Sequence, residues 1–423
     1  MIAKKLKFIV IILSTCILFC SCDTPQPDEG TANLTGTAAQ PSNAVSASLV
    51  LVNGRLIDGT GSDPIPDAVV ALKGERIVAV GTREQVIISP HTPTIDVQGA
   101  TILPGFINTH VHEAYNRESL EAWAQAGVTT VRDLGNNGTP SDLFAFRDEV
   151  SPDPKYARLV AAGPMVTVPG GYGRQPVTSP QDARQTITSL LDEGADLIKI
   201  AIEDDLQGRT WAMLSAEEIR AIVDTAHARN IPVSAHISRS RHLALALETG
   251  VDDVAHMIVD DLPDELIEGL IEAGVYWEPT LELWQCVSAL HGLGWDTTAI
   301  DNLRRFSQAG GKVALGTDYA GYRCPFDLGM PMTELELMRK AGMAPLQIIV
   351  AATRNAAHVC NLEEELGTLE PGKLADILVV EGNPLEDLNA LTNVRMVIHN
   401  GVIIRNSGGR NVNTAQSQND LGE

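Results

Sequence analysis

One stretch decides the fold: Leu103-Pro104-Gly105-Phe106-Ile107-Asn108-Thr109-His110-Val111-His112, in which two histidines close a largely apolar segment. His110 and His112 are two positions apart, so on a β-strand both side chains point to the same face. Imidazole nitrogens are natural zinc ligands, and two ligands from one strand need little extra ordering. An HxH pair alone is a weak signal. The pair predicts a metal site if further ligands end neighbouring strands.

The chain around this stretch alternates strand-like and helix-like patterns from 103 to 365. Candidate strands end at His112, Asp133, Ala162, Ile202, His236, His256, Thr280 and Asp318. Helical patterns lie between them at Arg117–Ala126, Ser179–Glu193, Ser215–Arg229 and Arg239–Thr249. Ser215 stands three residues before Glu218, as in a capping box, and Gly250 is placed to end a helix. Eight strand–helix units over this length predict an α/β fold, a (β/α)₈ TIM barrel.

Metal-capable residues lie at the ends of several of these strands, where barrel enzymes carry their functional groups. His236 and His256 end the fifth and sixth strands, and Asp318 ends the eighth. One such histidine is more often a core residue than a ligand, but four histidines with Asp318 would be an improbable accident. The other six are interpreted as structural or surface residues: His91, His227, His242, His291, His358 and His399.

Lys199 lies inside the apolar fourth strand, Gly194-Ala195-Asp196-Leu197-Ile198-Lys199-Ile200. A cation is costly to bury there. From the residues alone, a salt bridge to a neighbouring carboxylate is the simpler explanation.

The chain resembles the amidohydrolase superfamily, particularly its imidazolonepropionase-like and prolidase-like branch. The resemblance rests on the segment ending in His112, on Gly127-Val128-Thr129-Thr130-Val131-Arg132-Asp133 and on residues 366–378. It implies two divalent metal ions per chain, zinc being the usual one. His110, His112 and Asp318 would hold one ion and His236 and His256 the other. Lys199 would bridge them as a carbamate formed with CO₂.

The mechanism that the resemblance implies is hydrolysis by a metal-bridging hydroxide, with Asp318 as catalytic proton shuttle. The expected bond is an amide, dipeptide or cyclic amide C–N bond. Two alternatives stay open. The same metal site could hydrolyse a lactone or phosphotriester, or the protein could be a non-catalytic binding lipoprotein. The acidic residues after Lys199, Glu203-Asp204-Asp205, depart from the small, Gly-rich turn of prolidase-like relatives.

Substrate specificity is expected in the loops that follow the strands. Arginine suits bidentate recognition of a carboxylate, which favours a peptide-like substrate with a free C-terminal carboxylate. For any single arginine, pairing with an acidic side chain is the simpler expectation. The candidate substrate-binding residues are Tyr172, Arg174, Arg239, Arg241, Tyr322 and Arg323.

Segments of β-like sequence flank the barrel on both sides. Before it come Ser48–Ile57, with a hairpin signal at Asn53-Gly54, then Ala68–Leu72, Arg76–Val80 and Thr94–Val97. After it come Ala375–Val380 and two strands around Asn400-Gly401. We expect residues 48–102 and 366–406 to form one small β-sandwich beside the barrel of 103–365, followed by a disordered tail at 407–423.

The N-terminus has the pattern of a bacterial lipoprotein signal. Three lysines precede an apolar run that ends in Phe19-Cys20-Ser21-Cys22, so residues 1–21 are expected to be removed and Cys22 lipidated. Cleavage by an ordinary signal peptidase is the alternative. Residues 22–47 are expected to form a flexible tether. This predicts an exported protein held on a bacterial membrane by its lipid anchor, on the periplasmic or extracellular face.

The composition limits which binding partners and which cysteine chemistry are to be expected. The formal net charge is −23 and no basic block follows the extreme N-terminus, which argues against nucleic acid as a partner. A small-molecule or peptide-like substrate is expected instead. Cys286, Cys324 and Cys360 are the remaining cysteines of the body. An odd, widely spaced set predicts buried or incidental thiols rather than a disulfide framework.

Overall fold

The computed structural model describes residues 44–408 and 412–413, which belong to one compact unit. The signal peptide, Cys22, nearly all of the tether and the tail from 409, apart from 412–413, lie outside the described residues. Within the described part, no helix is both long enough and apolar enough to cross a membrane.

Parallel strands occupy the middle of the chain in two sheets. The first has the order β6-β7-β8 and the second the order β10-β9-β11-β14-β15-β16-β17. Their bounds are β6 Phe106–Val111, β7 Val128–Asp133, β8 Arg158–Ala161, β9 Val166–Thr167, β10 Gln175–Pro176, β11 Ile198–Ala201, β14 Val233–His236, β15 Asp253–Ala255, β16 Tyr276–Glu278 and β17 Lys312–Val313. Seven of the eight expected strands end within two residues of their predicted ends.

The eighth strand is the exception, because β17 stops at Val313 rather than Asp318. The backbone beyond it still pairs with β6. The amide of Thr109 donates to Leu315 O at 2.8 Å, and Val111 forms a parallel bridge with Tyr319. On the other side, the amide of Asp196 donates to Ala161 O at 3.0 Å, between the two sheets. Backbone contacts therefore join the first and last strands of the alternating region.

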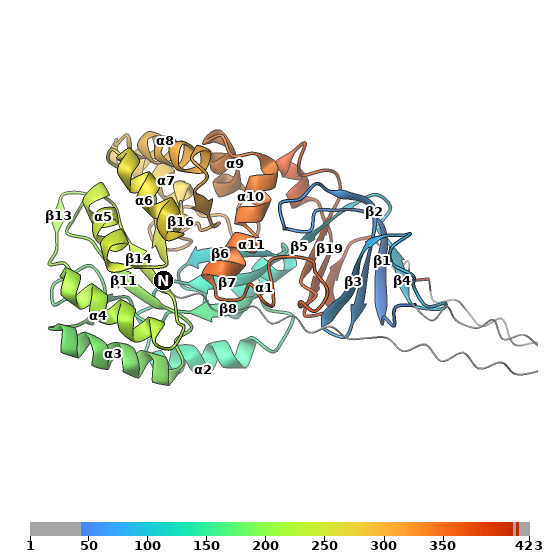
Figure 1. Cartoon of the computed structure of the whole chain (residues 1–423), viewed down its shortest axis with the longest axis horizontal. Helices are drawn as coiled ribbons and strands as arrows, with labels where there is room; N and C mark the ends of the chain where they lie inside the picture. The colour runs from blue at the N-terminus through green and yellow to red at the C-terminus, as the bar shows by residue number, and fades with distance from the viewer. Residues whose placement is uncertain (1–43, 409–411, 414–423) are drawn as a thin grey trace, which may run out of the picture. The chain divides into compact units, whose positions relative to one another are not determined.

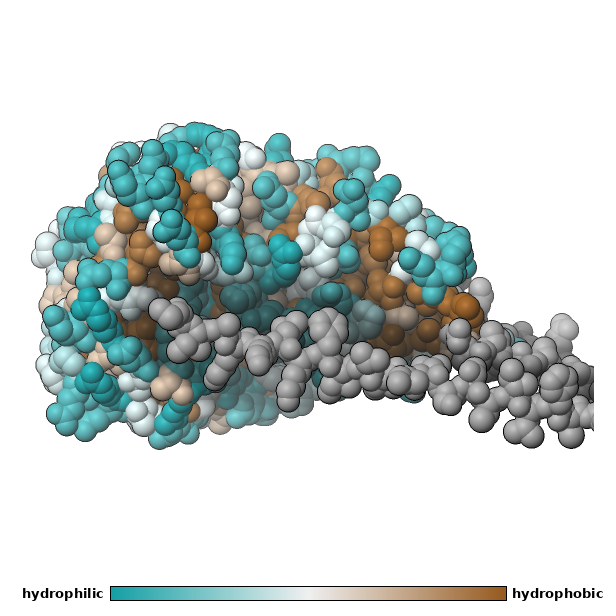
Figure 2. Space-filling model, in the orientation of Figure 1, coloured by the Kyte–Doolittle hydropathy of each residue, from teal (hydrophilic) through white to brown (hydrophobic). Residues whose placement is uncertain are grey.

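Helices follow the strands and lie outside them, as Figure 1 shows for α2 to α8. Their bounds are α1 Arg117–Gln125, α2 Pro140–Val150, α3 Pro180–Glu193, α4 Ala216–His227, α5 Ser240–Thr249, α6 Asp264–Ala273, α7 Leu281–His291, α8 Trp295–Gln308, α9 Met332–Lys340, α10 Pro345–Ala351 and α11 Arg354–Val359. The capping box of Ser215 and Glu218 and the left-handed stop at Gly250 are both confirmed. Figure 2 shows hydrophilic residues over much of the outer helices and hydrophobic residues between them.

A nine-stranded sheet is built from both flanking segments. Its main order is β20-β19-β18-β5-β1-β2-β3, with β4 beside β1 and β21 beside β4. The bounds are β1 Leu49–Leu56, β2 Ile65–Lys73, β3 Arg76–Thr82, β4 Thr94–Asp96, β5 Thr101–Pro104, β18 Ile377–Val380, β19 Val394–His399, β20 Val402–Asn406 and β21 Val412–Asn413; the 3₁₀ turn η1 covers Leu388–Thr392. The antiparallel pair β5–β18, with Leu103 opposite Leu378, joins the two segments. Since β5 leads directly into β6, this sheet anchors the strand that carries His110.

The hairpin expected at Asn53-Gly54 is wrong. Both residues lie inside the single strand β1, and the register against β2 shifts on either side of Gly54. Asn53 has φ 59°, a left-handed conformation that asparagine tolerates. The dipeptide therefore makes a bulge. A Cβ at Gly54 would come within 2.6 Å of Ile102, which explains why a residue without a side chain stands there.

The expectation of free thiols is wrong for two of the three cysteines. Cys286 on α7 and Cys324 in the loop after β17 form a disulfide with a Cα–Cα distance of 6.0 Å. Cys360 is free and buried, as expected. The pairing depends on bringing α7 next to a loop 38 residues further along the chain, and Cys spacing carries no signal for that contact.

Candidate metal centre

Several residues at the strand ends have left-handed backbone conformations. His256, Thr280 and Asp318 have φ values of 71°, 46° and 62°, and all three are buried. Such conformations are costly for residues other than glycine and cluster at functional sites. They turn the chain sharply as it leaves the strands.

The tightest group is formed by His110, His112 and Asp318. The Nε2 atoms of both histidines lie 3.0 Å from Oδ1 of Asp318. His110 and Asp318 are buried and His112 is partly buried, and the group is compact enough to hold a metal ion. Among the described residues, neither ring nitrogen of His110 has a hydrogen-bond partner of good geometry, although both are buried. Imidazole and carboxylate donors with unused lone pairs fit a zinc-like divalent ion.

The two histidines of this group have pKa values shifted in opposite directions. Burial holds the pKa of His110 well below its ordinary value, and Lys199 lowers it further. Burial also opposes protonation of His112, but Asp318 outweighs it and raises the pKa of His112 to about 9. The same two histidines hold the pKa of Asp318 well below its usual range despite its burial. Without a metal ion, a proton on His112 thus neutralises the carboxylate of Asp318.

Lys199 is 1% exposed, and within the described residues the only hydrogen bond of its side chain is a long one of 3.5 Å from Nζ to Ser234 Oγ. No carboxylate within 44–408 is in ion-pair contact with it, so the salt-bridge alternative is wrong for the described residues. Burial lowers the pKa of its amine to about 7, although the nearby carboxylates of Asp253 and Asp318 act against this, and Arg132 lowers it further. The amine therefore lies near carboxylates without forming an ion pair with any carboxylate of the described residues.

His236 and His256 face the same region from β14 and from the end of β15. Their ring centroids are 4.7 Å apart, and the ring of His110 lies 4.8 Å from that of His256. Burial lowers the pKa of both. The structure thus brings all six ligands expected from the sequence to one place.

Two glycines in the segment after β17 allow this packing. A Cβ at Gly316 would lie 2.8 Å from Cβ of His110, and one at Gly321 would overlap the carboxylate of Asp318. Any side chain at Gly321 would therefore displace Asp318.

A cavity of about 540 Å³ opens over these residues. Of the candidate substrate-binding residues, Tyr172, Arg174 and Tyr322 line it. The other three do not. Arg239 lies over the ring of Trp295, Arg241 pairs with Asp204, and Arg323 lies against Tyr322. The cavity is also lined by three residues that sequence reasoning missed, Arg209, Trp211 and Trp284. Arg209 begins the small strand β13 (Arg209–Thr210), which pairs with β12 (Asp205–Leu206).

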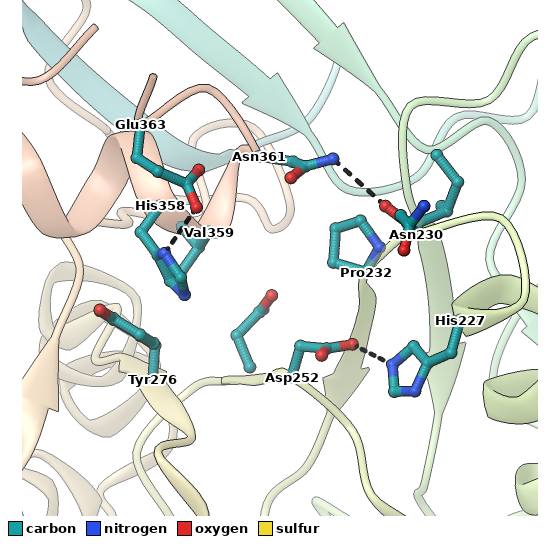
Figure 3. Close-up of a pocket in the computed structure, with 11 residues that line it drawn as sticks. His227, Asn230, Pro232, Asp252, Tyr276, His358, Val359, Asn361 and Glu363 are labelled. Atoms are coloured by element: carbon teal, nitrogen blue, oxygen red, sulfur yellow. Dashed lines mark hydrogen bonds and ion pairs between the residues drawn. The ribbon is translucent and has the colours of Figure 1, made fainter. Parts of the chain in front are cut away.

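A second cavity, of about 330 Å³, lies at the opposite ends of β14, β15 and β16 (Figure 3). Both of its histidines are paired with carboxylates: His227 with Asp252 at 2.8 Å, and His358 with Glu363 at 3.0 Å. These two histidines, like His242 and His399, have no place in the cavity above the strand ends.

Behind the ligands lie polar residues that the sequence did not single out. Glu278 Oε2 is 3.5 Å from Nδ1 of His110, and Thr280 Oγ1 is 2.8 Å from Nδ1 of His256. Glu278 is also held by the buried Arg132, which forms a bidentate pair with Asp253 at 3.0 and 3.1 Å. For Glu203 the available signal was a carboxylate directly after an expected strand end, Ile202.

Known proteins resemble the chain over most of its length. The sequence model described as "Amidohydrolase family" matches residues 101–404. The ochratoxinase of Aspergillus niger is 26% identical, with 83% of this chain and 84% of the relative covered. The imidazolonepropionase of Symbiobacterium thermophilum is also 26% identical, over 75% of this chain and 84% of the relative. A solved Xaa-Pro dipeptidase with methionine bound in its active site gives a TM-score of 0.74 at 26% identity, covering 84% of this chain and 99% of its own.

Proposed function

Because the chain belongs to the amidohydrolase family, we propose that it is a metal-dependent hydrolase that cleaves an amide-type C–N bond in a small substrate carrying a carboxylate. The observation that carries this proposal is the convergence of His110 and His112 on Asp318 at 3.0 Å each. The ochratoxinase, imidazolonepropionase and Xaa-Pro dipeptidase relatives support this choice of bond.

The proposed ligand set follows from this arrangement. His110, His112 and Asp318 would hold one divalent ion, and His236 and His256 would hold a second. Lys199 would complete the set as a carbamate, which forms when its uncharged amine adds CO₂ and releases a proton, and the lowered pKa of the amine favours this step. When bound, the two ions supply an activated water and polarise the substrate carbonyl.

The chain's own groups perform the proton transfers. Asp318, whose depressed pKa keeps it ionised, accepts the proton of the attacking water and returns it to the leaving amine. Tyr172 stacks on His236 with centroids 4.5 Å apart, and burial raises the pKa of its phenol. It therefore stays protonated and is available as a hydrogen-bond donor over the site.

Two arginines select the substrate. Arg174 and Arg209 line the cavity, and neither guanidinium has an ion pair or hydrogen bond within the described residues. In a chain of net charge −23, two arginines without acidic partners suit an anionic ligand. Tyr172, Trp211 and Trp284 offer aromatic surface beside them. We therefore favour N-acyl amino acids or dipeptides with an apolar side chain.

The test measures metal content and substrate range together. We expect two divalent ions per chain by elemental analysis and hydrolysis of N-acyl amino acids or Xaa-Pro dipeptides. Activity confined to lactones or phosphotriesters would mean that the same metal site catalyses the alternative reaction instead. Two ions without any turnover would favour the binding lipoprotein. A carbamate carbon signal from protein equilibrated with ¹³C-labelled CO₂, absent from Lys199→Met, tests the bridge.

The fold proposal is a closed (β/α)₈ barrel with a small β-sandwich beside it. The contacts of Thr109 with Leu315 and of Asp196 with Ala161 support closure, since they join the two parallel sheets on both sides. Residues Leu51, Leu56, Ile102 and Ile377 pack into a separate core within the nine-stranded sheet, which supports a second domain.

Export and lipidation at Cys22 remain part of the proposal. The Cys286–Cys324 disulfide supports export, because such bonds persist in oxidising compartments. Detergent partitioning of the full chain and of Cys22→Ala tests the anchor. Equal partitioning of both into the aqueous phase would contradict it.

A further inference from the structure

The four histidines of the proposed metal centre are each held from behind. In three of them, Nδ1 faces the holding group and Nε2 remains for an ion. The holding atoms are Gly135 O at 2.8 Å for His112, Thr280 Oγ1 at 2.8 Å for His256 and Glu278 Oε2 at 3.5 Å for His110. A partner on the far ring nitrogen fixes the tautomer and orientation of a ligating histidine.

His236 is held the other way round. Its Nε2 lies 3.5 Å from Oε2 of Glu203, and both atoms are buried and have no other hydrogen-bond partner among the described residues. This orientation leaves Nδ1 for the ion. Glu203 itself is fixed, because its Oε1 accepts the amide of Asp205 at 2.9 Å.

The register of the strands places Glu203 there. Ala201 at the end of β11 is opposite His236 at the end of β14, and the amide of Ile202 donates to His236 O at 3.0 Å. Glu203 follows immediately. The segment that carries Lys199 into the site therefore also delivers a carboxylate to the neighbouring histidine.

Two other roles for Glu203 fit the surroundings less well. Glu203 is 0% exposed and does not line the cavity, so it lies behind His236 rather than beside an ion held in front of it. Glu203, Asp204 and His242 also form a compact group that could hold a cation. However, Asp204 already pairs with Arg241 and with Nε2 of His242 at 2.8 Å, so a cation there would face a guanidinium.

We infer that Glu203 is a positioning residue, which accepts a hydrogen bond from Nε2–H of His236 and so presents Nδ1 to the second metal ion. This inference rests on the proposed function. Glu203 begins the acidic segment Glu203-Asp204-Asp205 that follows β11. Loss of such a partner weakens metal affinity about 10- to 100-fold.

The experiment titrates the purified full chain with Co²⁺ and Zn²⁺ and records metal stoichiometry, chelator-competition affinities and the visible Co²⁺ spectrum. Wild type, Glu203→Gln and Glu203→Ala are compared. Gln keeps an acceptor for Nε2–H, so we expect affinity for the second ion to fall in the order wild type, Gln, Ala, with the first ion unchanged. Glu282→Gln is the matched control. Like Glu203, Glu282 is a buried carboxylate, and its Oε1 accepts a hydrogen bond from the backbone amide of Asp327.

Folding is checked by thermal melting, since a purely structural role would lower the melting temperature without separating the two ions. Wild-type affinity for both ions in a folded Glu203→Ala variant would overturn the inference alone. His236→Ala separates that result from failure of the proposed site. If it also retained both ions, or if wild type bound fewer than two, the proposed ligand set would fail and the inference with it.

Discussion

Nε2 of His112 lies 3.0 Å from Oδ1 of Asp318, so the ends of the first and the last strand meet in one buried contact. The backbone repeats this contact, because the amide of His112 donates to Tyr319 O at 2.8 Å. The site is therefore complete only when the chain has closed from β6 to the segment after β17. Its two halves are more than 200 residues apart in the sequence.

Asp318→Asn should lower kcat by about 10²- to 10⁴-fold, because it removes the proposed base for the proton of the attacking water. Asn keeps a ligating oxygen and nearly the same volume, so we expect metal to remain bound. Steady-state kinetics with metal analysis on the same preparation measure both. Asp142→Asn, an exposed change in the first turn of α2, should leave both unchanged. Full turnover of Asp318→Asn with two ions bound would remove the shuttle role.

The His112–Asp318 contact should make the metal-free protein less stable as pH rises towards 9. Burial opposes the charge on His112, but Asp318 raises its pKa from 6.5 to about 9 in the folded state. A raised folded pKa contributes stability that is complete below pH 6.5 and is lost as pH rises through 9. Lys199 and Glu334, with pKa values of about 7 and about 8, titrate in the same range. The measurement is therefore the difference in melting temperature between metal-free wild type and His112→Asn.

That difference should shrink between pH 6.5 and 9. A constant difference would mean that His112 is uncharged throughout. Zinc must displace this proton, so the affinity of the first site should rise about tenfold per pH unit up to pH 9.

The sequence predicted which candidate ligands come together because the positions of the strand ends are local information. Apolar runs ending in His236 or His256 could be recognised without knowing their neighbours. The groups behind the ligands could not be recognised this way. Glu203 is near His236 only through the register of β11 against β14, and a register depends on the closed sheet. The hairpin prediction at Asn53-Gly54 failed for the same reason, because the need for glycine there comes from Ile102 on another strand.

The Cys286–Cys324 disulfide should stabilise both the fold and the wall of the cavity. It closes a 38-residue separation, for which the expected contribution is about 2–4 kcal/mol. The double variant Cys286→Ser/Cys324→Ser should lose that amount in denaturant unfolding. Trp284 on α7 and Tyr322 in the loop both line the cavity, so KM should rise more than kcat falls. Dithiothreitol should have the same effect on wild type and none on the double variant; equal sensitivity of both would contradict the assignment.

Arg174→Ala and Arg209→Ala should each weaken binding of substrates that carry a free carboxylate. A hydrogen bond to a charged group contributes about 1.5–3 kcal/mol, so kcat/KM should fall about 10- to 100-fold. Substrates with the carboxylate amidated should be cleaved equally by wild type and variants, because they have no charge for the arginines to bind. Arg184→Ala is the control, since Arg184 is exposed on α3 and its guanidinium donates a hydrogen bond to Pro180 O in the same helix. If kcat/KM fell as much for the amidated substrates as for the free acids, both arginines would act by holding the loops in place. The carboxylate would then have to be recognised elsewhere in the cavity.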